Sequence, residues 1–298
     1  MVFATLESSR VRLCPKWGGE RTGRIYRYTD AKLPHLIRCA SWSDRSNPLL
    51  GGAQQAVYLP QMRDELITKL TAALENVAGL EAVVLGGSRG RGTAGPQSDY
   101  DIGLYYWRDD PLDINALESA VKPLVDEPNQ HVTQLGEWGQ WINGGGWLTI
   151  DGVKVDLLYR ELDLVHHVVD EAQAGRFTMD YQVGHPHGFC SVILAGEVAT
   201  CRILHECSGQ LSDLKKRTSP YSSNLKQALV ARFGWEVGFA TDNAKLAAQR
   251  GEQNHVAGCA YRALSCLAQV IFALNERYLI SEKGALPEAA TCPITVTG

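Results

Sequence analysis

The chain has 298 residues, of which 45% are hydrophobic, enough for a sizeable core in one large or two modest domains. Its 29 basic and 33 acidic residues give a formal net charge of −4, which argues against nucleic acid as the main partner, because nucleic-acid binders present concentrated basic surfaces. We find no apolar run of about 18 residues, no secretory leader and no CxxC pair among the eight cysteines, and therefore expect a reduced, cytoplasmic protein without a membrane span.

Residues 1–55 are rich in Arg, Trp, Gly, Pro and Ser and show no sustained hydrophobic period. Val11–Leu13 and Ile25–Tyr28 are the candidates for short strands. A segment of this composition buries little apolar surface, so we expect a disordered extension or a stretch that precedes the true start of the protein.

The next segment predicts helices over a sheet. Apolar residues in 61–77 recur at i, i+3 and i+4, which is typical of a helix that covers a sheet. Leu80–Leu85 and Tyr100–Tyr106 are predicted to be strands, and Asp113 is predicted to cap a helix that runs to Val125.

A hairpin is predicted after these elements, because Asp151-Gly152 forms a turn signal between two apolar stretches. The elements expected in this part are a strand over His131–Leu135, the hairpin strands Trp147–Ile150 and Val153–Tyr159, and a helix over Leu162–Ala174 that ends at Gly175.

Beyond residue 185 the periodicity is helical throughout. The predicted helices cover Phe189–Ala195, Val198–His205, Gln210–Arg217, Ser223–Gln249 and Asn254–Tyr278. The two long helices are joined by a short loop, which favours an antiparallel pair at the centre of a helical bundle. We therefore expect an N-terminal extension over 1–55, an α+β catalytic domain over 56–180 and an all-α domain over 181–298.

One motif carries chemistry. Asp99 and Asp101 are spaced i, i+2, so a strand would place both carboxylates on one face. Neighbouring carboxylates suit Mg²⁺, which completes its shell with water and substrate phosphates. The Gly87-Ser88 turn before them offers main-chain N–H groups and a hydroxyl to phosphate. Together these residues predict a site for a metal-bound nucleoside triphosphate.

Gly87-Ser88 and Asp99-Tyr100-Asp101 resemble the signature of the nucleotidyltransferase superfamily related to DNA polymerase beta. The resemblance covers Gln61–Arg160 and implies a mixed β-sheet flanked by helices, with a third carboxylate on a neighbouring strand. Asp156 is the candidate for it. Within the superfamily the chain is most similar to the small stand-alone enzymes, including aminoglycoside and lincosamide nucleotidyltransferases, which carry a helical domain after the sheet.

The resemblance implies an enzyme that uses Mg²⁺ to move an NMP, expected to be AMP, from ATP or another nucleoside triphosphate to a hydroxyl of a small-molecule acceptor. Asp99 and Asp101 are the expected metal ligands, and Asp156 completes the second metal position or takes the acceptor proton. Glu276 is the candidate acceptor contact. The candidate phosphate contacts are Gly87, Ser88 and Lys283, together with Arg89 or Arg91.

Several alternatives stay open. The chain could instead adenylylate a protein or a tRNA, as toxin–antitoxin relatives do, or be a catalytically silent nucleotide-binding relative. Arg250–His255 also resembles the Arg-x4-His motif of HEPN ribonucleases, but Gly251 predicts a helix break within it. His185-Pro186-His187 is interpreted as a structured turn. The sequence leaves open the identity of the acceptor and the choice between monomer and dimer.

Overall fold

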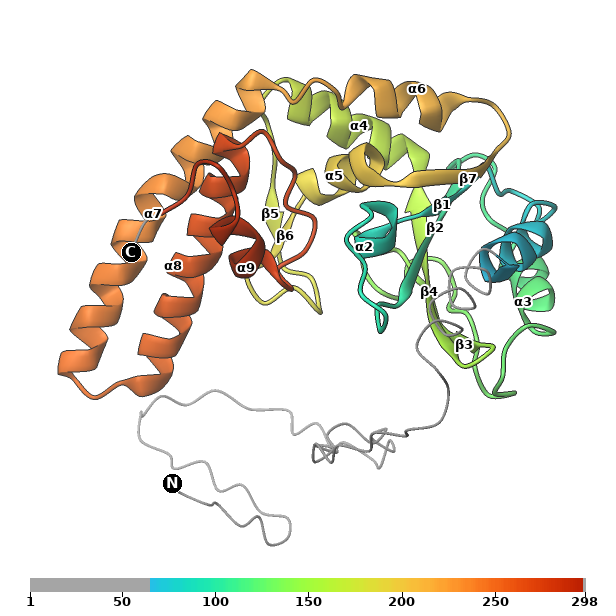
Figure 1. Cartoon of the computed structure of the whole chain (residues 1–298), viewed down its shortest axis with the longest axis horizontal. Coiled ribbons are helices and arrows are strands. Elements are labelled where there is room, and N and C mark those ends of the chain that lie inside the picture. Colours follow the sequence, from blue (N-terminus) through green and yellow to red (C-terminus); the bar gives the residue numbers. More distant parts are fainter. Residues whose placement is uncertain (1–64, 297–298) are drawn as a thin grey trace, which may run out of the picture. The chain divides into compact units, whose positions relative to one another are not determined.

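The computed structural model describes residues 65–296 (Figure 1). The predictions for residues 1–55, including the two short strands, lie outside the described residues. The predicted helix over 61–77 is helical over 65–74 within the described part.

A five-stranded mixed sheet lies at the centre of the fold, in the order β3-β4-β2-β1-β7. β2 and β4 are parallel, and the other neighbouring strands are antiparallel. The strands are β1 (Ala82–Leu85), β2 (Tyr100–Tyr106), β3 (Gly145–Ile150), β4 (Val153–Glu161) and β7 (Arg202–Glu206). The sheet confirms the predicted α+β class and the hairpin, here β3–β4.

Both faces of the sheet are covered, which explains why β1 is an unbroken apolar run rather than an alternating one. Val83 belongs to the core formed with the 65–74 helix and α3 (Ile114–Val121). The next residue, Val84, points to the other face and joins the core formed with α4 (Leu162–Gln173) and α5 (Val192–Thr200).

The helix ends follow local signals. Asp113 caps α3 as predicted, because its carboxylate accepts a hydrogen bond from the Ala116 main-chain N–H at 2.9 Å. However, α3 ends at Val121 rather than Val125. α4 ends before Gly175, whose φ of 76° closes the helix as predicted.

Two long helices dominate the C-terminal part and pack side by side, antiparallel (Figure 1). α7 (Ser223–Gln249) has the predicted bounds, whereas α8 (Gln253–Leu274) ends before the predicted Tyr278. Gly251 adopts a φ of 73° in the loop between them, so Arg250 and His255 do not lie on one helix and the HEPN resemblance is not supported. The remaining elements are α2 (Gly87–Gly90), β5 (Met179–Asp180), β6 (Phe189–Cys190), α6 (Gln210–Arg217) and α9 (Ala285–Ala290).

The prediction of helices alone beyond residue 185 is wrong. The predicted helices at Phe189–Ala195 and Val198–His205 are replaced by β6, α5 and β7. Cys201 breaks the helical pattern with extended dihedrals, and the segment after it pairs with the free edge of β1, from Ala82↔Glu206 to Leu85↔Arg202. The central sheet therefore includes β7, which lies beyond residue 180, where we expected an all-α domain. The predicted strand at His131–Leu135 is reduced to one bridge, Val132↔Gly146.

By length and composition, α8 is apolar enough to cross a membrane, which departs from the expectation drawn from the sequence. In the structure this helix packs along α7, and Arg262 in its middle forms an ion pair with the buried Glu236 of α7. The core helix of a soluble protein meets the same test of length and composition.

Candidate active site

The sheet brings two of the predicted carboxylates side by side. Asp101 on β2 and Asp156 on β4 are register partners in the parallel pair, so their side chains leave the same face at the same level. Asp99 stands one residue before β2. All three line one cavity of about 730 Å³, which Gly87, Ser88 and Lys283 also line.

The Gly87 turn packs directly against Asp101. Gly87 has a φ of 55°, and a Cβ added there would collide with the Asp101 carboxylate. The Gly86 N–H donates to the Asp101 main-chain oxygen at 2.7 Å. Only glycine permits both the positive φ at residue 87 and the close contact with the Asp101 carboxylate. The position of the turn and that of the carboxylate therefore depend on each other.

Negative charge is concentrated here. Burial, followed by the charges of Asp156, Glu197 and Asp99, raises the pKa of Asp101 to about 6 from 3.8. Burial and Asp99 also raise the pKa of Asp156, against the opposing effect of nearby lysines. Carboxylates that are held together and partly desolvated in this way are stabilised by a bound cation.

The donor set fits Mg²⁺ rather than a metal that needs a full set of protein ligands. Within residues 65–296, no three or more His, Cys, Asp or Glu side chains are grouped so that they could hold a metal ion, so the structure does not bring Asp99, Asp101 and Asp156 together as the predicted set of metal ligands. Mg²⁺ takes one or two carboxylates and keeps water and phosphate in its remaining positions, which Asp101 and Asp156 can satisfy.

Two of the predicted contacts lie elsewhere. Arg89 does not line the cavity: its Nε donates to the carbonyls of Ser98 and Asp99, both at 3.1 Å, and its guanidinium lies 3.9 Å from the Tyr100 ring centroid. It therefore holds the segment leading into Asp99. Glu276 is bound to Lys226 at 2.8 Å and is also absent from the cavity lining. Arg91, by contrast, lines the cavity and pairs with Glu288 at 3.0 Å.

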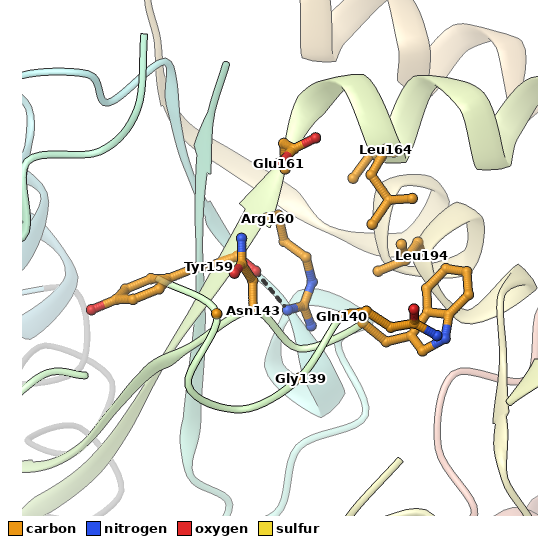
Figure 2. Close-up of a pocket in the computed structure, with 11 residues that line it drawn as sticks. Gly139, Gln140, Asn143, Tyr159, Arg160, Glu161, Leu164 and Leu194 are labelled. Atoms are coloured by element: carbon orange, nitrogen blue, oxygen red, sulfur yellow. Dashed lines mark hydrogen bonds between the residues drawn. The ribbon is translucent and has the colours of Figure 1, made fainter. Parts of the chain in front are cut away.

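The cavity wall contains a buried ion pair that the sequence did not indicate. Arg160 on β4 is only 4% exposed and binds both carboxylate oxygens of Glu197 on α5, at 2.7 and 2.8 Å. Arg160 also lines a second cavity of about 320 Å³, where it donates to the Tyr159 carbonyl at 2.9 Å (Figure 2). The two residues lie far apart in the sequence, so no local signal indicated the pair.

Two loops from outside the predicted catalytic domain complete the wall. One contains His185, and the other contains Ser281, Glu282 and Lys283. Glu282 accepts a hydrogen bond from the Tyr261 hydroxyl and another from the His187 main-chain N–H, at 3.2 Å. His185-Pro186-His187 was interpreted from the sequence only as a turn, so its place in the cavity was missed.

Two protein families match parts of the chain. Residues 67–175 match the nucleotidyltransferase domain family, and residues 194–283 match a domain of unknown function (DUF4037). No curated protein matches the chain. A nucleotidyltransferase-like protein from Exiguobacterium sibiricum 255-15, solved by crystallography, is similar at 12% identity over 80% of this chain, with a TM-score of 0.34. The chain covers 63% of that protein.

The family match covers the glycine turn, both carboxylate strands and the hairpin, and the mixed sheet is consistent with the fold of this family. The likeness to the nucleotidyltransferase superfamily therefore extends over residues 67–175.

Proposed function

We propose that the protein is a Mg²⁺-dependent nucleotidyltransferase that moves AMP from ATP to a hydroxyl of a small-molecule acceptor of the aminoglycoside type. One observation carries the proposal: Asp99, Asp101, Asp156, the Gly87-Ser88 turn and Lys283 line a single cavity. This arrangement supplies carboxylates for a metal beside donors for a triphosphate.

In this reaction the acceptor oxygen attacks the α-phosphorus, and pyrophosphate leaves from the opposite side. Bound Mg²⁺ would offset the charge that develops on the phosphate oxygens. Asp101 and Asp156 would hold the ion, with Asp99 beside them. The Ser88 hydroxyl, the main-chain N–H groups of the turn and the Lys283 ammonium would bind the β and γ phosphates.

The cavity also supports a small acceptor. Its volume of about 730 Å³ lies within the range of small-molecule sites, which is about 300–1,000 Å³. Glu282 lines it, and its carboxylate would favour an acceptor with amino groups. The alternative acceptors remain a protein or a tRNA, and the alternative to catalysis is a silent nucleotide-binding protein.

The test is a transfer assay on the full chain with ATP labelled at the α-phosphate, MgCl₂ and a panel of aminoglycosides and lincosamides. We expect Mg²⁺-dependent pyrophosphate release and a labelled product, both lost in Asp101→Asn. The control is Asp242→Asn, which changes an exposed aspartate paired with Lys245 on α7. Equal, metal-independent release by the wild type and Asp101→Asn would refute the proposal. Label on co-purified protein or tRNA instead would favour the alternative acceptor.

A further inference from the structure

The turn at His185 forms part of the wall of the cavity that contains the proposed reaction centre. It lies in the loop between β5 and β6, and His185 lines the same cavity as Asp101, Asp156 and Lys283. The sequence indicated only a turn here, and the proposed function gives the imidazole no role. Asp101 and Asp156 lie on strands of the sheet, whereas His185 lies outside it.

The His185 ring is packed against a neighbouring ring but forms no hydrogen bond with the described residues. Its ring packs edge-on against the buried Phe189, with centroids 5.0 Å apart and an interplanar angle of 75°. In the described part of the chain its ring nitrogens form no hydrogen bond or ion pair, whereas the His187 ring lies 3.5 Å from the Cys266 sulfur. His185 therefore lines the cavity with ring nitrogens that have no partner among residues 65–296.

The loop fixes the position of this ring. The His185 N–H donates to the Gln182 carbonyl at 3.1 Å, and its carbonyl accepts from the Gly188 N–H at 2.9 Å. Gln182 is buried and donates to the Trp138 carbonyl at 2.7 Å. A ring on such a turn can keep one geometry relative to a bound acceptor.

Burial keeps the imidazole of His185 in its uncharged, basic form. Burial lowers the pKa of His185 below its ordinary value of 6.5. Glu282 and Glu197 oppose this effect, while Arg160 and Lys283 add to it. At neutral pH the ring is therefore uncharged and one nitrogen carries a lone pair.

The carboxylates that share this wall are already bound. Glu197 accepts two hydrogen bonds from the Arg160 guanidinium, and Glu282 accepts from the Tyr261 hydroxyl and the His187 N–H. Asp156 would be occupied by the metal. Resting on the proposed function, we infer that His185 is the general base that takes the proton of the acceptor hydroxyl.

The proton and electrons balance in this step. The acceptor O–H proton moves to the free nitrogen of His185, and the electron pair of that bond stays on the oxygen. This oxygen forms a bond to the α-phosphorus, while the bond from the α-phosphorus to its bridging oxygen breaks and the pair leaves with pyrophosphate. The imidazolium then returns its proton to water.

The test compares His185→Gln with His187→Gln, a variant of the same turn whose ring faces α8. Both are assayed with ATP, MgCl₂ and the panel acceptor that the wild type turns over fastest. We expect His185→Gln to lower kcat by about 10²–10⁴-fold, the usual contribution of a general base, and to remove the acidic limb of the pH profile. His187→Gln should keep that limb.

Two further measurements separate a catalytic from a structural role. ATP binding in MgCl₂, followed by calorimetry, should be unchanged in His185→Gln, and added imidazole should restore part of the activity of His185→Ala. If the wild type is active and His185→Gln keeps both its kcat and the acidic limb, this inference is overturned but the proposed function is not. Absence of transfer by the wild type to every acceptor would overturn the proposed function and this inference together.

Discussion

Asp101 should destabilise the metal-free protein at neutral pH. Its pKa is raised from 3.8 to about 6 in the folded chain, so the folded state holds this proton more tightly than the unfolded state. Below about pH 4 both states are protonated and the effect vanishes. Between pH 4 and 6 the unfolded state ionises first, so stability falls as pH rises and stays low above pH 6.

The magnitude follows from the shift. One pKa unit corresponds to about 1.4 kcal/mol, so a shift of about two units costs about 2–3 kcal/mol above pH 6. Asp101→Asn keeps the shape of the side chain and removes its charge. We therefore expect this variant to be more stable than the wild type by about 2–3 kcal/mol at pH 7.5 in EDTA, or about 5–10 °C in Tm.

The assay is urea unfolding in EDTA from pH 4 to 8, with Asp242→Asn as an exposed control. The difference between wild type and Asp101→Asn should grow from near zero at pH 4 to its full value above pH 6. Adding MgCl₂ and ATP should stabilise the wild type and not Asp101→Asn. A variant that is no more stable than the wild type at pH 7.5, or a difference independent of pH, would refute the reasoning.

Other predictions test the turn, the ion pair and the phosphate contact. Gly87→Ala should lower the free energy of unfolding in urea by more than about 1 kcal/mol and abolish transfer. Gly92→Ala should lower it less, because Gly92 has a similar φ of 73° but open space around it. Equal losses in the two variants would contradict the packing argument. Glu197→Gln should lower the free energy of unfolding by about 3–5 kcal/mol, because it leaves the Arg160 charge unpaired. The double variant Arg160→Met, Glu197→Leu should recover most of that loss. Lys283→Met should raise KM for ATP about tenfold with Tm unchanged, and an unchanged KM would remove Lys283 from the phosphate site.

Strong local patterns predicted most of the element types. The long α7 has a polar cap at Ser222 and helical periodicity over many turns, so its bounds were predicted from the sequence. β2 and β4 were predicted from apolar runs bounded by turn signals, and the structure places Asp101 and Asp156 opposite each other on these strands. The roles of these carboxylates stay predictions.

Tertiary contacts decided the rest. Arg202–Glu206 follows an apolar helix and has no strong strand pattern, and it becomes a strand because the edge of β1 offers unpaired main-chain groups. The pair of Arg160 and Glu197 is formed by the packing of α5 on the sheet, which no local window contains. The same packing brings α5 into the cavity wall, and β7 extends the central sheet past residue 200.

Arg89 and Lys283 show how a motif and a site differ. Arg89 lies inside the motif, yet its guanidinium is used on the carbonyls of Ser98 and Asp99, so it acts on the site only by positioning Asp99. Lys283 lies far outside the motif, yet the chain returns after α8 and brings it to the cavity beside Glu282. Under the proposed function, the motif supplies the carboxylates for the metal and one set of phosphate contacts, and Lys283 adds another from outside it. We expect the acceptor to be selected at Glu282, which lines the same cavity as His185. Variants at Glu282 should therefore change the preferred acceptor before they change the KM for ATP.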